Sequence, residues 1–212
     1  MEDEPRASLR ESYGRKARER DLDAIQPWKS EERLRFLTLL QSEEKRTLLE
    51  LGAGPGKDGK FFHDHGLEVV CTDLSSEMVA LCKEKGLAAH VMDLSDLDFP
   101  PDAFDAAYAL NCLLHLPRRE LPAALHGIQT VLKPTGLFYL GVYGGRDHEG
   151  VWSADLYEPK RFFSFYTDEH LQEIVSASFD IRSFRRIALG ERADGLHFQS
   201  LILRKAQRPG YT

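Results

Sequence analysis

The stretch LLELGAGPG, residues 48–56, decides the fold of this chain. It begins as an apolar run typical of a buried strand, places Glu50 near the end of that run, and continues into glycines at the alternate positions Gly52, Gly54 and Gly56. Glycine lacks a Cβ, so its backbone can take positive φ and approach a ligand closely. A helix starting near Lys57 would direct free backbone N–H groups to the same place. The stretch therefore predicts a nucleotide-cofactor loop.

The glycine spacing discriminates between kinds of cofactor loop. A phosphate-binding P-loop requires G-x-x-x-x-G-K-[ST], whereas Gly52 and Gly56 stand one residue too close and Asp58 follows Lys57. The dinucleotide fingerprint G-x-G-x-x-G would need its third glycine where Lys57 stands, and it does not require an acid before the loop. The spacing excludes the P-loop and leaves an NAD-dependent oxidoreductase as an alternative.

Strand-like and helix-like segments alternate after residue 46. The predicted strands cover residues 47–51, 68–72, 88–92, 104–110 and 136–142, and the predicted helices between them cover 57–65, 76–85 and 121–132. This βαβ rhythm favours a parallel sheet. A capped helix over 167–177 precedes two more strands, 179–187 and 197–203, whose connection contains Asp194-Gly195 and no helix, so these two should pair antiparallel. We expect an α/β fold with a doubly wound, mostly parallel seven-stranded sheet and an antiparallel C-terminal strand pair.

The N-terminal part is expected to form helices that precede this sheet rather than build it. Residues 1–45 form a helical cap, with charges suited to a solvated helix surface at Arg10, Glu11, Arg15, Lys16, Arg18, Glu19, Arg20 and Asp21. A second helix is expected to start after Ser30 as N-cap and to contribute Leu34, Phe36, Leu37 and Leu40 to apolar contacts. Residues 46–206 make the main domain, with 143–166 as an insert that binds the acceptor or forms a lid. The chain is expected to be one structural domain.

Composition limits the partners. Lys and Arg together number 28 against 34 for Asp and Glu, a net charge of −6, so no global basic field points to nucleic acid. The apolar runs are strand-sized and the first residues are acidic, so we expect a cytoplasmic protein without membrane association, as a monomer or homodimer. Cys71, Cys82 and Cys112 are far apart and show no metal-ligand spacing, so no metal is expected.

The segment Glu50-Leu51-Gly52-Ala53-Gly54-Pro55-Gly56 resembles motif I of the class I methyltransferases, which use S-adenosyl-L-methionine. The resemblance is strong over residues 47–142, because Asp73, Asp93, Phe104-Asp105-Ala106 and Leu132-Lys133-Pro134-Thr135-Gly136-Leu137 follow in the family's order. Thr135 stands where the family usually has Gly. The resemblance implies a transferase that moves the methyl group of S-adenosyl-L-methionine in line to a small-molecule acceptor and releases S-adenosyl-L-homocysteine. A non-catalytic cofactor-binding protein, or one that methylates a macromolecule, remains an alternative.

Polar residues directly after the strands are the candidate cofactor ligands, since ligands of open α/β sheets bind beyond the carboxyl ends of the strands. Asp73 ends the second strand, where its carboxylate can accept from both ribose hydroxyls. The resemblance assigns Asp93 and the Leu94 N–H to adenine, Leu74 and Met92 to a sandwich around its ring, and Asn111 and Glu50 to the methionine end. It also implies that the glycine loop with Ala53, and Tyr13, Trp28 and Lys29 from the N-terminal side, close the cofactor pocket.

Acceptor binding is expected to depend on positioning more than on a base, since the sulfonium is already an activated leaving group. His115 is the candidate base because an imidazole titrates near neutral pH, with a structural role as its alternative and His148 with Glu149 as a rival pair. The insert holds Tyr143, Trp152, Tyr157, Phe162, Phe163, Phe165 and Tyr166 within 24 residues. We expect His148, Trp152, Tyr157 and Phe163 to contact the acceptor, against the alternative that the rings pack a lid or an oligomer contact.

Overall fold

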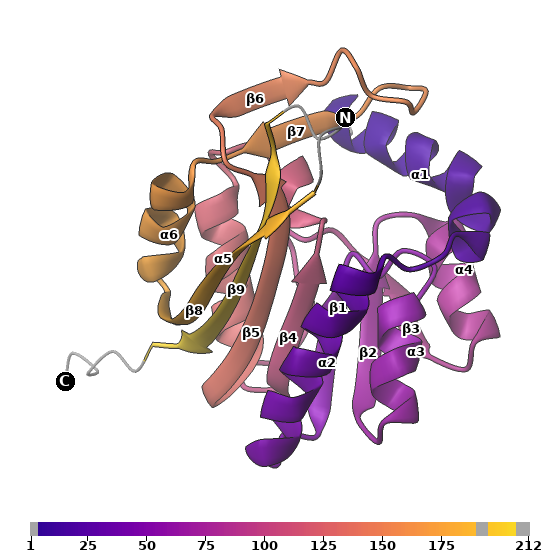
Figure 1. Ribbon diagram of the computed structural model, residues 1–212. Helices are drawn as coiled ribbons and strands as arrows, with labels where there is room; N and C mark the ends of the chain where they lie inside the picture. The colour runs from indigo at the N-terminus through magenta and orange to yellow at the C-terminus, as the bar shows by residue number, and fades with distance from the viewer. Residues whose placement is uncertain (1–3, 190–194, 207–212) are drawn as a thin grey trace.

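The computed structural model describes residues 4–189 and 195–206. Its main feature is a seven-stranded sheet in the order β3-β2-β1-β4-β5-β9-β8 (Figure 1). The strands are β1 (Thr47–Leu51), β2 (Glu68–Asp73), β3 (Ala88–Val91), β4 (Phe104–Leu110), β5 (Leu132–Gly144), β8 (Phe179–Ala188) and β9 (His197–Lys205). Neighbours among β1 to β5 pair parallel, and β9 runs antiparallel to both β5 and β8. The predicted fold class, including the antiparallel C-terminal pair, is confirmed.

Helices cover both faces of this sheet. The first face carries α2 (Pro27–Ser42), α3 (Lys57–Asp64) and α4 (Ser76–Glu84), and the second carries α5 (Leu121–Val131) and α6 (Asp168–Ser176). Successive side chains of a strand point to opposite faces. Accordingly, Leu48 packs with the first group of helices, while Leu49 and Leu51 pack with the second. Burial on both sides explains why β1 reads as a continuous apolar run.

The second N-terminal helix departs from the prediction in its start and in its role. It begins at Pro27 rather than after Ser30, because proline suits the first helical turn, where its missing N–H costs nothing. Leu34 is 54% exposed, but three apolar side chains of α2 are buried against the sheet: Phe36, Leu37 and Leu40. The expectation that the N-terminal helices only precede the fold was therefore wrong for α2, which forms part of the core.

The ends of α3, α4, α5 and α6 lie within one residue of the predicted positions, and local signals account for two of the starts. The Ser75 hydroxyl accepts from the Met78 N–H at 3.3 Å at the start of α4, and Thr167 caps α6 in the same way. Thr135 has φ +63°, a left-handed conformation that costs a β-branched residue free energy and that explains the glycine usual at this position. Asp194, half of the predicted C-terminal turn, lies outside the described residues, and its neighbour Gly195 has φ +78°.

Two segments cover the carboxyl ends of the parallel strands (Figure 1). Helix α1 (Glu4–Leu22) crosses this edge and packs on α4 through a small cluster of Ala17, Met78 and Leu81. Beside it lies a hairpin formed by β6 (His148–Val151) and β7 (Phe162–Phe165), which was not predicted within the insert. A short 3₁₀ helix, η1 (Leu113–His115), follows β4 beneath them. Among the described helices, none combines the length and the apolar character needed to cross a membrane.

Candidate functional site

Two adjoining cavities open at the carboxyl edge of the sheet and share wall residues. The shared wall consists of Arg20, Lys29, Gly52, Gly54 and Leu110. The first cavity continues to Tyr13, Asp73, Leu74, Asp93, Leu94, Asn111 and His115, and the second to Glu50, Ala53, Lys57 and Asp58. The structure thus brings together residues that were predicted for the cofactor from six separate parts of the sequence.

The three glycines of the loop serve three different purposes. Gly54 has φ +55° and faces open space, since an added Cβ would meet no atom within 4 Å. Gly52 has φ +58°, and a Cβ there would lie 2.3 Å from the Cβ of Cys112, so packing requires this glycine. Gly56 precedes α3 and lies against Cys82, and it is not among the described residues that line the two cavities. Among the three glycines of the loop, Gly54 is therefore the one that leaves free space for a ligand to approach the backbone.

Asp73 is held in one orientation at the end of β2. Its Oδ1 accepts from the Ser75 N–H at 2.9 Å, and its Oδ2 accepts from the Gly54 N–H at 2.8 Å. Burial raises the pKa of Asp73, and these two N–H groups act in the opposite direction. Each carboxylate oxygen can accept a second hydrogen bond, so Asp73 can still bind two hydroxyl groups of a ligand.

Glu50 provides a buried carboxyl group on the wall of the second cavity. It is 3% exposed, and the Cys71 thiol donates to its Oε2 at 3.2 Å. Burial, reinforced by the neighbouring Asp58, raises the pKa of Glu50 well above its ordinary value. The sequence reasoning missed Gly59 in α3, where an added Cβ would lie 2.3 Å from the same Oε2. A glycine in the first turn after the loop is thus required for the Glu50 side chain to fit.

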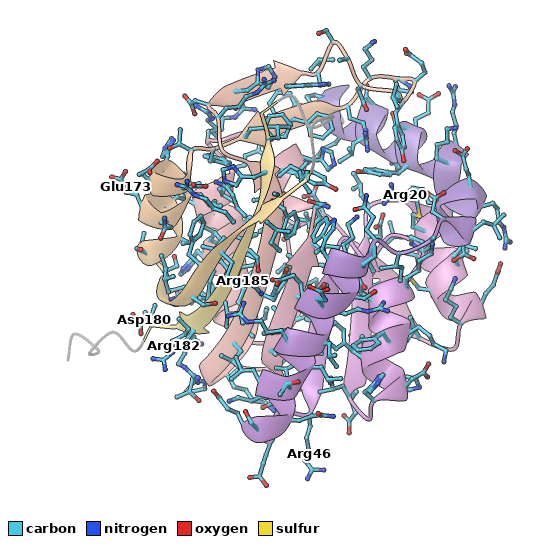
Figure 2. The ribbon with its side chains drawn as sticks, viewed as in Figure 1. Arg20, Arg46, Glu173, Asp180, Arg182 and Arg185 are labelled. Atoms are coloured by element: carbon cyan, nitrogen blue, oxygen red, sulfur yellow. The ribbon has the colours of Figure 1, made fainter. Side chains whose placement is uncertain are left out.

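Arg20 and Lys29 place positive charge where the cavities meet. Within residues 4–189 and 195–206, neither side chain forms an ion pair with a carboxylate, and Arg20 Nε is buried without a hydrogen-bond partner. Burial lowers the pKa of Lys29. Figure 2 shows Arg20 on α1 in the upper half of the view, whereas Arg46 lies at the bottom. These unpaired cations can bind an anionic group of a ligand.

The prediction that this part of α1 is a solvated surface was wrong for Arg20. The signal that could have identified it is a spacing of seven residues, which places Arg6, Tyr13 and Arg20 on one face of a helix. All three line the first cavity.

His115 lies on the cavity wall but has no free ring nitrogen. Its Nδ1 lies 2.8 Å from the Phe162 carbonyl, which only accepts, so Nδ1 carries the proton and Nε2 accepts from the Tyr13 hydroxyl at 2.8 Å. Burial lowers the pKa of His115 to about 3. The predicted general-base role does not fit these contacts, because a base needs a lone pair available to the acceptor and a pKa near the working pH. These contacts fit the alternative, a structural role for His115.

The four predicted acceptor residues are not among the described residues that line the two cavities. His148, Trp152 and Phe163 pack with Phe165 as an aromatic core of the hairpin, with centroids of neighbouring rings 5.1 to 6.5 Å apart. Among these four predicted residues, Tyr157 connects to the site, since its hydroxyl accepts from Arg20 at 2.9 Å. The rings other than Tyr157 therefore form the hairpin, as the alternative reading of the insert expected.

Three further predicted residues also lie elsewhere among the described side chains. Trp28 packs on Phe198 with ring centroids 4.4 Å apart, and neither Trp28 nor Met92 lines either cavity. His148 and Glu149, the alternative to His115 as general base, are both engaged in other contacts. Glu149 accepts from the Arg118 N–H at 2.9 Å, and His148 packs on Trp152. The sequence reasoning missed Arg161, which donates to the Tyr13 hydroxyl at 2.9 Å and pairs with Asp155.

Comparison with known proteins gives matches to methyltransferases. Residues 48–136 match the methyltransferase-domain family. The malonyl-[acyl-carrier protein] O-methyltransferase of Salmonella typhimurium is 30% identical over 105 residues, which cover 48% of this chain and 41% of that protein. The phosphoethanolamine N-methyltransferase of Plasmodium falciparum is 23% identical over 151 residues, 68% of this chain and 56% of that one. The chain thus matches about half the length of these curated relatives.

A solved structure shares the fold over nearly the whole chain. It is the 1,6-didemethyltoxoflavin-N1-methyltransferase of Burkholderia thailandensis with bound 1,6-didemethyltoxoflavin and S-adenosylhomocysteine. The TM-score is 0.72 at 23% identity, with 95% of this chain and 88% of that chain covered. Residues 48–136 thus match a methyltransferase domain, and the chain shares its fold with a methyltransferase over nearly its whole length. The antiparallel β9 beside β5 differs from the dinucleotide-binding order 3-2-1-4-5-6, which argues against the oxidoreductase alternative.

Proposed function

We propose that this protein transfers the methyl group of S-adenosyl-L-methionine to a small-molecule acceptor. The observation that carries the proposal is the arrangement of charge along the two adjoining cavities. The second cavity is lined by two cations without an acidic partner among the described residues and by one buried acid, namely Arg20, Lys29 and Glu50. The first cavity is lined by the strand-end acids Asp73 and Asp93. The cofactor has the complementary pattern, with a carboxylate and an amino group at its methionine end and hydroxyls and an amino group at its adenosine end.

At the methionine end, Arg20 and Lys29 would bind the carboxylate, since neither is paired with an acid of the described chain. Glu50 would bind the amino group. Burial favours the neutral form of Glu50, and a bound ammonium group would favour its ionised form. Asn111 supports the same assignment, since its buried Oδ1 has no partner among the described residues and the residue lines the cavity wall.

At the adenosine end, Asp73 would accept from the ribose hydroxyls and Asp93 from the amino group of the base. Leu74 and Leu94 line the same cavity and would pack against the ring. Gly54 would allow close approach of the cofactor between the two ends, because the space that its Cβ would fill is open.

The bound cofactor would supply a methyl group on a positively charged sulfur, which is an activated leaving group. The protein would then need to hold the acceptor in line and exclude water. Positioning can contribute about 7–11 kcal/mol of barrier reduction, whereas a general base contributes about 3–5 kcal/mol. Tyr13 and Arg20 of α1 would cover the reacting region, and His115 would hold Tyr13 in place rather than accept a proton.

A small acceptor is favoured over a macromolecule by the cover that α1 and the hairpin form over the carboxyl edge. The net charge of −6 points the same way, since it opposes attraction of nucleic acid.

A ligand panel tests the proposal. S-adenosylhomocysteine at about 100 times its Kd should stabilise the protein by about 2.7 kcal/mol in a thermal unfolding assay, and NAD should give no shift. Release of S-adenosylhomocysteine would then be measured with amine, phenol, thiol and carboxylate acceptors. Stabilisation by NAD alone would establish the oxidoreductase alternative. Stabilisation by S-adenosylhomocysteine without turnover on any small acceptor would contradict the proposed acceptor class.

A further inference from the structure

We propose that Arg6 of α1 determines which purine base the site accepts, by fixing the carboxylate of Asp93 so that it selects a 6-amino over a 6-oxo group. The inference rests on the proposed function, because it concerns the nucleobase end of the same cofactor. It adds a residue 87 positions away in sequence from the strand-end acid that would contact the base.

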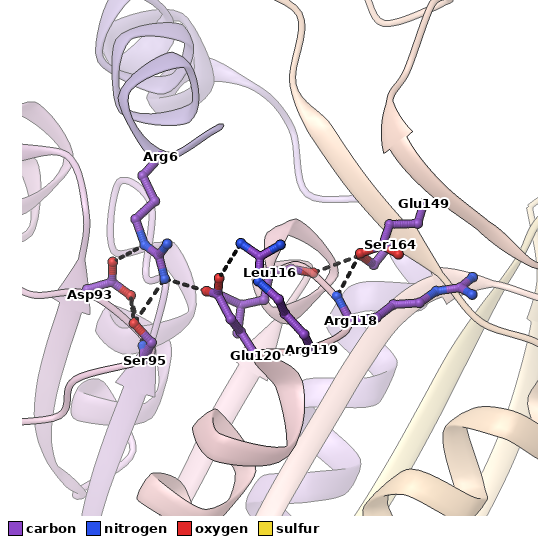
Figure 3. Close-up of polar contacts among 9 residues, drawn as sticks. All are labelled: Arg6, Asp93, Ser95, Leu116, Arg118, Arg119, Glu120, Glu149 and Ser164. Atoms are coloured by element: carbon purple, nitrogen blue, oxygen red, sulfur yellow. Dashed lines mark hydrogen bonds and ion pairs between the residues drawn. The ribbon is translucent and has the colours of Figure 1, made fainter. Parts of the chain in front are cut away.

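Arg6 extends from α1 toward Asp93, Ser95 and Glu120 (Figure 3). Its Nε donates to Asp93 Oδ2 at 2.5 Å, and its terminal nitrogen donates to Glu120 Oε2 at 2.5 Å and to Ser95 Oγ at 3.1 Å. The Arg6 and Asp93 side chains are 22% and 26% exposed, so the pair is largely shielded from water. Within the described part of the chain, Asp93, Ser95 and Glu120 from two different segments hold the guanidinium group in position.

The contacts of Asp93 leave one oxygen for a ligand. Its Oδ1 already accepts from the Ser95 N–H at 2.8 Å and from the Ser95 hydroxyl at 2.7 Å. Its Oδ2 accepts from Arg6, and a carboxylate oxygen can accept one more hydrogen bond. Asp93 lines the cavity, so a base bound there would hydrogen-bond to Oδ2, which has one acceptor position left.

The charge balance keeps Asp93 ionised. Burial alone would raise the pKa of Asp93, but the hydrogen bonds from Ser95 and Arg6 lower it below its ordinary value. An ionised carboxylate has no proton to donate. The exocyclic amino group of adenine can donate to Oδ2, whereas the carbonyl oxygen of a 6-oxo purine would place two acceptors against each other.

Without Arg6, the carboxylate would lose this constraint. It could rotate away from Ser95 or take up a proton, and a protonated Asp93 could donate to a 6-oxo group. The predicted effect is therefore a loss of discrimination between the two bases, in addition to any general loss of affinity from a looser α1.

The test compares S-adenosylhomocysteine with S-inosylhomocysteine by calorimetry in the wild type, in Arg6→Met and in Arg119→Met. Arg119 is a matched control because it also contacts Glu120, at 3.3 Å, and its described ion pair does not involve Asp93. The Arg119 side chain is 75% exposed. We expect Arg6→Met to reduce the ratio of the two affinities about tenfold, which corresponds to about 1.4 kcal/mol, and Arg119→Met to leave it unchanged. Arg6→Lys, which keeps the charge, should restore most of the ratio.

The possible outcomes separate the inference from the proposed function. An equal fall in both affinities in Arg6→Met would show that Arg6 only holds α1 in place, and a wild type without base preference would also overturn the inference. Failure of both ligands to bind the wild type would instead overturn the proposed function. If Arg6→Met does not fold, Arg6→Lys and Arg6→Gln, measured in the same way, decide between these results.

Discussion

The hydroxyl of Tyr13 lies 2.8 Å from Nε2 of His115 and joins the N-terminal helix to the turn after β4. Because His115 Nδ1 donates to the Phe162 carbonyl, the hydroxyl must be the donor in this contact. The hydroxyl oxygen in turn accepts from Arg161 of the insert at 2.9 Å. Three segments that cover the site, namely α1, η1 and the insert, therefore meet at one phenol oxygen.

This relationship predicts the effect of Tyr13→Phe, which keeps the ring and removes the hydroxyl. Both hydrogen bonds are lost, so the free energy of unfolding should fall by about 1–3 kcal/mol. The affinity for S-adenosylhomocysteine should also fall, because α1 lines the cavity. Urea unfolding and calorimetry measure the two effects. A variant with the stability and affinity of the wild type would show that the phenol oxygen does not hold α1 in place.

The role of His115 predicts a change in the pH dependence of stability and none in that of catalysis. Burial lowers the pKa of His115 to about 3 in the folded protein, against about 6.5 in an unfolded chain. The unfolded state therefore binds more protons, and the contribution of His115 to stability decreases as the pH falls from about 6.5 toward 3. A His115→Gln variant should lose this dependence, as measured by urea unfolding at pH 7.5 and pH 5 (about one unit or more to either side of the unfolded value).

The same variant separates the two roles considered for His115. If it were the general base, its removal would abolish the rise of kcat with pH near neutrality. We expect the pH profile of kcat to keep its shape, with its level lowered by the looser α1.

Glu50→Gln is expected to stabilise the fold and weaken cofactor binding. Burial raises the pKa of Glu50 well above its ordinary value, so the folded state holds a proton that the unfolded chain has released above about pH 4.3. The stability that this proton provides is complete at low pH and is lost as the pH rises through the raised pKa. Glutamine cannot ionise. The difference in unfolding free energy between the variant and the wild type should therefore be larger at pH 8 than at pH 4.5, which lies close to the reference pKa of about 4.3.

Binding of S-adenosylhomocysteine by Glu50→Gln should fall about ten- to hundredfold, the usual effect of removing a charge-assisted hydrogen bond. Calorimetry at a single neutral pH measures it. Unchanged affinity would remove Glu50 from the proposed binding of the amino group, whatever its effect on stability.

Two helical glycines form a matched pair for Gly→Ala substitution. In α3, the Cβ of Gly59→Ala would lie 2.3 Å from Glu50 Oε2 and 2.8 Å from Cys71 Sγ, so it must displace the Glu50 side chain. In α5, the Cβ of Gly127→Ala would meet only Leu97 Cδ1, at 4.0 Å. We expect Gly127→Ala to be neutral or to stabilise by up to about 1 kcal/mol, because alanine favours helices.

Gly59→Ala should destabilise the fold by about 1–3 kcal/mol, as overpacking of a buried site does, and it should lower cofactor affinity. Thermal unfolding and calorimetry on both variants measure these effects. Equal behaviour of the two variants would show that the space beside Glu50 is not needed.

The sequence was sufficient for the parts of the fold that depend on local patterns. The bounds of β1 and β4 agree with the prediction, since an apolar run next to a glycine loop or an Asn-containing turn has clear ends. The capped start of the helix predicted from residue 167 is likewise observed, with Thr167 as the capping residue. The start of α2 at Pro27 was missed because Ser30 offered a more conspicuous capping residue than a proline in the first turn.

The cofactor residues at strand ends could be predicted because topology brings the carboxyl ends of parallel strands together. The contacts of Arg6 with Asp93 and of Arg161 with Tyr13 could not, because they join residues 87 and 148 positions apart and leave no local pattern. The aromatic residues of the insert were assigned to the acceptor on composition alone. Composition cannot distinguish rings that line a cavity from rings that pack on each other, as Trp152 and Phe165 do.

The central claim is that the glycine loop and the strand-end acids form a site for S-adenosylmethionine. Calorimetric titration with S-adenosylhomocysteine of the wild type, of Asp73→Asn and of the exposed control Asp98→Asn tests it most directly. We predict saturable binding by the wild type and by Asp98→Asn, and an affinity about ten- to hundredfold lower for Asp73→Asn. Absence of binding by the wild type, or equal affinities for all three proteins, would contradict the account.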